Sequence, residues 1–142
     1  RRNPRREGRQ MQAELGDILV VDDSELIHKL QGLVARRLGL TLSHAYNGLE
    51  GLALARKKKF RAILLDLNMP VLDGLSFLET LRKEELGEPV PVIVISTESE
   101  DEDIRRALER GATAYVKKPF TCEKISAVRA RILGVAKKAA PG

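Results

Sequence analysis

Apolar and polar residues follow one another along this chain in a repeating order, in which a short apolar run precedes an amphipathic stretch. The apolar runs predict strands at residues 17–23, 41–45, 61–66, 89–96 and 113–116. The amphipathic stretches predict helices at residues 24–39, 47–58, 74–86, 99–111 and 121–134. Ser24 suits the N-cap of the first helix, and Ser99 with Glu102 has the spacing of a capping box in the fourth.

This alternation of strands and helices predicts an α/β fold. Parallel strands that are joined by helices form a sheet covered on both faces, and the nearly continuous apolar character of the strands agrees with such burial. In doubly wound folds of this kind, ligands bind beyond the carboxyl ends of the strands. The residues that end the strands are therefore the candidates for a functional site.

Polar side chains of complementary chemistry stand at these strand ends. They are Asp22 and Asp23 at the end of the first strand, Asp66 at the end of the third, Ser96 and Thr97 at the end of the fourth, and Lys117 and Lys118 after the fifth. Carboxylates are hard oxygen ligands of the kind that Mg²⁺ prefers, and a lysine with a hydroxyl suits a phosphoryl group. A carboxylate beside a divalent cation can act as a nucleophile in phosphoryl transfer.

Each of these side chains also has an ordinary structural explanation. Asp22 and Asp23 can cap the first helix, and Asp66 can begin an Asx turn before Pro70. Ser96 and Lys118 can be solvated polar side chains of loops. A common site is favoured because all of these strand ends should meet at one edge of the sheet.

Charge and composition argue against a nucleic-acid-binding protein. The net charge is +5, but residues 1–10 hold five arginines and one glutamate, so most of the excess lies in that segment. Aromatic residues make up only 4% of the chain, too few for a base-stacking surface. We therefore expect no nucleic-acid partner without an additional output domain.

The single cysteine, Cys122, excludes an intramolecular disulfide, and no apolar run approaches the ~20 residues of a membrane span. A cytoplasmic protein without a membrane partner is expected.

Three regions follow from these patterns. Residues 1–16 are expected to be a basic tail that is disordered or was added by cloning, since they include few apolar residues to bury. Residues 17–134 are expected to form one domain. Residues 135–142 read as a C-terminal tail.

Four motifs at the strand ends resemble those of the receiver domain of two-component response regulators, the CheY-like family. They are VVDDS at 20–24, LLDLNMPVLDG at 64–74, PVIVIST at 91–97 and YVKKPF at 115–120. Their order and spacing agree with the family over residues 17–134. The resemblance implies a flavodoxin-like (βα)5 fold with a parallel five-stranded sheet of order 2-1-3-4-5.

The resemblance also assigns an acceptor and a metal site. Asp66 stands where the family has its phospho-acceptor. Asp23, Asp66 and the backbone carbonyl of Asn68 would bind Mg²⁺, and Asp22 would assist through water. Lys118 matches the catalytic lysine better than Lys117, because Lys118 directly precedes a proline.

Further positions of the family concern switching and the lifetime of the phosphorylated state. Ser96 falls at the hydroxyl residue that follows the phosphoryl group, and Tyr115 falls at the switch aromatic. Asn68 and Glu98 occupy the positions that modulate autodephosphorylation. Thr97 stands where a smaller residue is common, so it can crowd the phosphoryl oxygens.

The expected function is that of a signalling switch. A sensor histidine kinase would donate the phosphoryl group, and the protein would catalyse its own phosphorylation and dephosphorylation without being an enzyme toward an external substrate. A downstream target protein would bind the surface of helix 99–111, strand 113–116 and helix 121–134. A stand-alone receiver of the chemotaxis type is expected, and the alternatives are a receiver cut from a larger regulator or a binding module that works without phosphorylation.

Two enzyme or cofactor classes fit less well. A phosphohydrolase with an aspartate nucleophile usually has a second acid two residues later, where this chain has Asn68. A nucleotide-binding Rossmann domain would need a G-x-G-x-x-G motif after the first strand, and none is present. His28 and His44 are expected to lie away from the strand-end cluster and to have no phosphohistidine role. A redox role for Cys122 is not expected.

Overall fold

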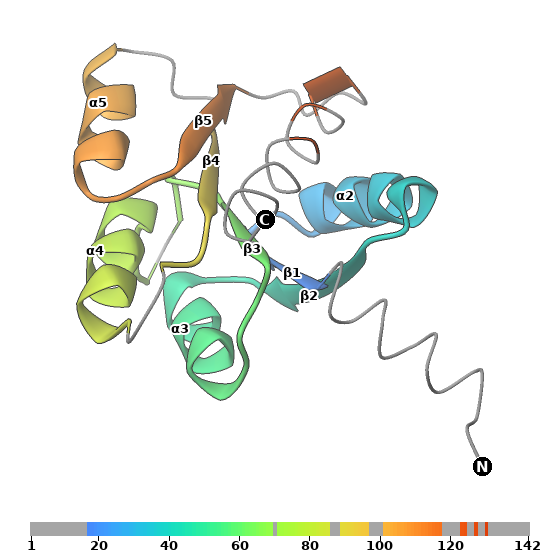
Figure 1. Ribbon diagram of the computed structural model, residues 1–142, viewed down its shortest axis with the longest axis horizontal. Coiled ribbons are helices and arrows are strands. Elements are labelled where there is room, and N and C mark those ends of the chain that lie inside the picture. The colour runs from blue at the N-terminus through green and yellow to red at the C-terminus, as the bar shows by residue number, and fades with distance from the viewer. Residues whose placement is uncertain are drawn as a thin grey trace, which may run out of the picture.

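The computed structural model describes residues 17–69, 71–85, 89–96 and 101–117, together with Glu123, Lys124, Ala127 and Ala130. A parallel five-stranded sheet of order β2-β1-β3-β4-β5 runs through the molecule (Figure 1). The strands are β1 (Asp17–Val21), β2 (Thr41–Ala45), β3 (Ala62–Leu65), β4 (Val92–Ser96) and β5 (Ala114–Lys117). The α/β fold and the strand order expected from the resemblance are thereby confirmed.

The helices that connect the strands are α2 (Glu25–Leu38), α3 (Gly48–Lys57), α4 (Gly74–Glu84) and α5 (Asp101–Glu109). They correspond to the first four predicted helices. Most of the fifth, at 121–134, lies outside the described residues, as do both predicted tails.

The sheet separates two apolar layers, because successive side chains of a strand point to opposite faces. Leu19 and Val21 of β1 belong to the larger core cluster, with Phe77 and Leu78 of α4 and Ala107 of α5. Ile18 and Val20 belong to the second cluster, on the other face of the sheet. Figure 1 shows α3, α4 and α5 on one side of the strands and α2 on the other.

Side-chain caps start three of the helices. The side chains of Ser24, Asn47 and Asp73 accept hydrogen bonds from the backbone N–H groups of Ile27, Glu50 and Ser76, respectively. Such caps satisfy N–H groups that have no partner within the helix. The predicted cap at Ser24 is confirmed, whereas the capping box that starts at Ser99 lies outside the described residues.

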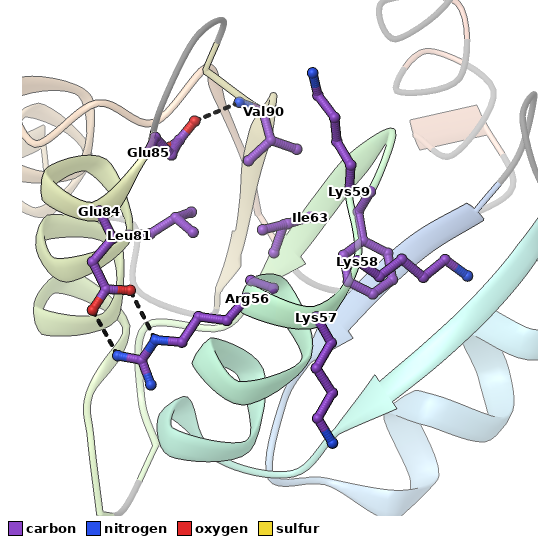
Figure 2. Close-up of a pocket in the computed structure, with 11 residues that line it drawn as sticks. Arg56, Lys57, Lys58, Lys59, Ile63, Leu81, Glu84, Glu85 and Val90 are labelled. Carbon is purple, nitrogen blue, oxygen red and sulfur yellow. Dashed lines mark hydrogen bonds and ion pairs between the residues drawn. The ribbon is translucent and has the colours of Figure 1, made fainter.

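Helices α3 and α4 are joined at the edge of the sheet where the strands begin. Arg56 of α3 reaches across to Glu84 of α4 and donates two hydrogen bonds, from Nε (2.9 Å) and Nη2 (2.6 Å) (Figure 2). Leu81, Ile63 and Val90 line an open cavity of about 420 Å³ beside this ion pair. The cavity lies at the opposite end of the strands from the acidic residues described next.

Candidate functional site

Three aspartates meet at the carboxyl edge of the sheet. Asp22 and Asp23 follow β1, and Asp66 follows the neighbouring strand β3. One carboxylate oxygen from each lies within 4.8 Å of the others. Asp22 and Asp66 are only 3% and 6% exposed, whereas Asp23 is exposed. Carboxylates this close repel one another, and two of the three are poorly solvated, so a cation at this position would offset a substantial electrostatic cost.

Main-chain hydrogen bonds hold Asp66 in this position. Its N–H donates to the carbonyl oxygen of Val21 at 2.9 Å, which extends the pairing of β3 with β1 by one residue. The chain then turns, and Gly74 at the start of α4 donates its N–H to the carbonyl oxygen of Leu67 at 3.1 Å. The acid is therefore set by the sheet on one side and by the first turn of α4 on the other.

Asp22 is held through three of its groups. Its N–H donates to the carbonyl oxygen of Ala45 on β2 at 3.1 Å. Its side-chain Oδ1 accepts the N–H of Ser24 at 2.9 Å, and its carbonyl oxygen lies 2.7 Å from His28 Nε2. The N-cap of α2 is Ser24, so the alternative capping role for Asp22 is wrong; the Asp22 side chain instead accepts the N–H of that cap residue and belongs to the acidic cluster.

His28 is the residue that the sequence interpretation misplaced. It was expected to lie away from the strand-end cluster, but its buried ring contacts the main chain of Asp22 and lies 2.7 Å, Nδ1 to Nδ1, from His44 on β2. The signal that could have found it is positional. His28 lies in the first turns of the helix that directly follows Asp22, and β2 is paired in register with β1.

The electrostatics of His44 follow from this contact. Although the residue as a whole is exposed, one side of its ring faces His28. Desolvation of that side, and then the charge interaction with His28, lower the pKa of His44. Tyr46 packs on the ring of His28, with 4.3 Å between the two ring centroids.

The remaining predicted residues are only partly described. Ser96 ends β4, next to β3, and is fully buried. Tyr115 on β5 is half-buried and packs against the larger core cluster, and Lys117, which ends β5, is in register with Ser96. Asn68 is exposed, two residues beyond Asp66. Lys118, Thr97 and Glu98 lie outside the described residues.

The donor set suits a hard divalent cation. Within the described part of the chain, Asp22, Asp23 and Asp66 are the acidic or histidine side chains that lie close enough together to hold one metal ion. All three offer carboxylate oxygens, which Mg²⁺ prefers over nitrogen or sulfur ligands. The residues present therefore fit a magnesium ion.

Comparison with known proteins places this arrangement in a family. A family model described as the response regulator receiver domain matches residues 18–129. The chain belongs to this receiver domain family. The receiver is 41% identical over 111 residues to the transcriptional regulatory protein PrrA of Mycobacterium leprae, a match that covers 78% of this chain and 46% of PrrA.

Two solved structures extend the comparison. The chemotaxis response regulator CheY4 of Vibrio cholerae superposes with a TM-score of 0.77 at 30% identity, over 83% of this receiver and 98% of that chain. The receiver domain of a sensor histidine kinase from Pseudomonas aeruginosa PAO1 superposes with a TM-score of 0.76 at 28% identity, over 84% and 98% of the two chains. That structure has a magnesium ion coordinated in its active site cleft.

The receiver spans less than half the length of the first curated relatives that it matches, from 13% to 49% of each. In the described part of the chain, no helix is both long and apolar enough to cross a membrane.

Proposed function

We propose that this receiver accepts a phosphoryl group on Asp66 from a sensor histidine kinase, in a reaction that requires Mg²⁺. The observation that carries the proposal is the position of Asp66, a buried carboxylate at the carboxyl end of β3 with Asp22 and Asp23 oxygens within 4.8 Å. Burying a carboxylate without a partner costs free energy, and placing further carboxylates beside it raises that cost. Such a cluster is therefore expected at a functional site, where a bound cation neutralises the negative charge.

The transfer itself is a displacement at phosphorus. A carboxylate oxygen of Asp66 attacks the phosphorus of a phosphohistidine, the P–N bond breaks, and its electron pair remains on the imidazole of the donor. The product is an acyl phosphate on Asp66. Main-chain hydrogen bonds already orient Asp66, so little ordering is needed when the donor arrives.

Several residues of this chain would assist. Asp23, Asp66 and the carbonyl of Asn68 would hold the Mg²⁺, with Asp22 acting through water. When bound, the ion supplies positive charge to the phosphoryl oxygens. Lys118 would pair with one of those oxygens, and Ser96 would donate a hydrogen bond to another.

The phosphorylated state would be short-lived, and the protein would act as a switch rather than on an external substrate. Hydrolysis of the acyl phosphate returns Asp66 to a carboxylate and releases phosphate. Asn68 and Glu98 would control the approach of water, and this polar pair resembles that of the fast chemotaxis regulators. We therefore favour a chemotaxis-type receiver, for which a phosphorylated half-life of many hours would count against the assignment.

Labelling with acetyl phosphate tests the acceptor. With Mg²⁺, the wild type should take up acid-stable, base-labile label, and Asp66→Asn should lose it. Asp103→Asn on α5 is the matched control and should label normally. Full labelling of Asp66→Asn would show that the acceptor is another residue, and failure of the wild type to label would favour a binding module that works without phosphorylation.

A metal titration tests the ligand assignment separately. Asp23→Asn should weaken Mg²⁺ binding, because it removes an exposed carboxylate from the cluster while leaving the buried pair in place. The titration can be followed by amide shifts in NMR spectra. An unchanged affinity would remove Asp23 from the metal site.

A further inference from the structure

A buried imidazole ties the acidic cluster to the edge strand of the sheet. His28 on α2 is 3% exposed, and both of its ring nitrogens are engaged. Nε2 lies 2.7 Å from the carbonyl oxygen of Asp22, and Nδ1 lies 2.7 Å from Nδ1 of His44 on β2. Tyr46 packs against the ring of His28. The ring thus connects β1, β2 and α2 at one point.

The hydrogen-bond partners determine where the protons lie when both rings are neutral. A backbone carbonyl can only accept, so Nε2 of His28 carries the hydrogen that it donates to Asp22. Nδ1 of His28 is then the acceptor, and Nδ1 of His44 must donate to it. Donation runs in one direction, from His44 through His28 to Asp22.

The carbonyl that receives this hydrogen bond belongs to the peptide group between Asp22 and Asp23. The preceding peptide group is fixed as well, because the N–H of Asp22 donates to Ala45. Both peptide planes around Asp22 are therefore held. In the part of the chain that the structure describes, the side chain of Asp23 makes no hydrogen bond, so the direction of its carboxylate depends on this main chain.

We propose that His28, oriented by His44, is a positioning residue that holds the Asp22–Asp23 peptide so that both carboxylates face the metal site. The inference rests on the proposed function in so far as that site binds Mg²⁺. A buried histidine that only fills the core would affect the stability of the fold and nothing else. A positioning role for His28 differs, because loss of its Nε2 donor should also change the affinity for Mg²⁺. Partners that orient metal ligands typically change affinity by about ten- to a hundredfold when removed.

Three variants of His28 and His44 separate the effect of the hydrogen-bond donor from the effect of side-chain packing. His28→Leu fills much of the space and donates nothing, so Mg²⁺ affinity should fall about tenfold. His28→Gln places an amide N–H near the position of Nε2 and should recover most of the affinity. His44→Phe keeps a ring beside His28 but removes the proton donor, so a smaller loss of affinity is expected.

Gln31→Leu is the matched control. Gln31 is also a buried polar residue of α2, 5% exposed, and its Oε1 has no hydrogen-bond partner among the described residues. It should leave Mg²⁺ affinity unchanged whatever it does to the melting temperature. Affinities of all variants are measured by following amide shifts during a Mg²⁺ titration. If His28→Leu binds Mg²⁺ within twofold of the wild type, the positioning role is wrong.

A metal-free measurement distinguishes this inference from the proposed function. At mildly alkaline pH, where free imidazoles are neutral, nitrogen-15 spectra should show His28 protonated on Nε2 and His44 on Nδ1. His28→Leu or, if that variant does not fold, His44→Phe should shift the Asp22 carbonyl and Asp23 amide resonances, and His28→Gln should bring them back toward the wild type. The opposite tautomers, or unmoved resonances, would overturn the inference. Absence of Mg²⁺ binding in the wild type with these signatures intact would instead count against the proposed function.

Discussion

Gly74 lies against the main chain of Asp66, so closely that a Cβ atom on Gly74 would stand 2.5 Å from the carbonyl oxygen of Asp66. The same Cβ would stand 2.6 Å from the Cα of Leu67. Both neighbours are backbone atoms, which cannot move aside as the end of a flexible side chain can. The main chain at the start of α4 therefore approaches the main chain of the proposed acceptor so closely that only glycine fits at position 74.

Gly74→Ala should consequently damage both stability and the site. We expect a loss of about 1–3 kcal/mol in the free energy of unfolding, the usual cost of inserting a methyl group into a packed region. Phosphorylation by acetyl phosphate should slow, because relief of the clash displaces Asp66. Urea unfolding and the labelling assay measure the two effects.

Gly32→Ala is the control for this substitution. Gly32 lies within α2, and a Cβ there would meet no atom of the described residues within 4 Å. Alanine should stabilise the helix by roughly 0.5–1 kcal/mol and leave phosphorylation unchanged. If Gly74→Ala were as well tolerated as Gly32→Ala, the close approach at Asp66 would not exist in solution.

Val71 has a strained backbone in the loop that follows Asp66. Its φ is 74°, in a region that β-branched residues rarely adopt, and its side chain is 72% exposed. Glycine adopts this conformation without strain, and little packing would be lost. Val71→Gly should therefore stabilise the protein by about 1 kcal/mol. This is the strain energy that the substitution relieves, reduced by the greater conformational entropy that glycine gives to the unfolded chain.

Val71→Ala separates strain from the loss of the branched side chain. Alanine keeps a Cβ atom and with it most of the unfavourable contact with the backbone. Its effect on the melting temperature should be smaller than that of glycine. A destabilised Val71→Gly would indicate that the loop does not hold a positive φ at this position.

The ion pair between Arg56 and Glu84 should give a pH-dependent contribution to stability. The hydrogen bonds from Arg56 lower the pKa of Glu84, and those to Glu84 raise the pKa of Arg56. A carboxyl group whose pKa is lowered by folding contributes above its ordinary pKa, and the contribution is lost as the pH falls through the folded value. Because both groups are exposed, the effect should be small and sensitive to salt.

Comparison of Arg56→Met with the wild type measures this contribution. The difference in melting temperature should be largest near neutral pH and should shrink at pH values below the ordinary pKa of glutamate and at high salt. Lys57→Met, one residue on in α3, is the control because Lys57 makes no ion pair within the described residues. A difference that grows as the pH falls would contradict the assigned cause.

The proposed switch predicts coupling between Ser96 and Tyr115. Ser96 is buried at the end of β4, and Tyr115 on the adjacent strand β5 packs against the core. A phosphoryl group on Asp66 would draw the Ser96 hydroxyl toward it, and the Tyr115 ring would move into the space released. Ser96→Ala should still accept phosphate but should transmit the change poorly.

NMR spectra with beryllofluoride as the phosphoryl mimic test this coupling. The ring resonances of Tyr115 and the amides of α5 and β5 should shift in the wild type and shift much less in Ser96→Ala. Shifts confined to the acidic cluster would mean that a partner reads the phosphorylated edge directly, and not the surface of residues 99–133.

The order of elements and the acidic strand ends could be predicted from the sequence because they depend on local pattern. Apolar runs mark the buried strands, the period of apolar residues marks the helices, and Asp22, Asp23 and Asp66 stand directly after two of those runs. Parallel strands bring their carboxyl ends to one edge of the sheet, so chain direction places these acids at the same edge, and the adjacency of β1 and β3 then brings them within reach of one another. The strand order came from the resemblance to the receiver family, and the structure agrees with it.

Tertiary structure decided what surrounds those acids. Three contacts depend on how α2, β2 and α4 are placed, to within about an ångström, against the strands beside them: His28 with Asp22, His44 with His28, and Gly74 with Asp66. A hydrogen bond or a steric clash appears or vanishes over such distances, whereas hydrophobic burial, which produces the pattern, varies gradually with position. The sequence by itself therefore determined which acids meet, and only the packed structure determined how their main chain is held.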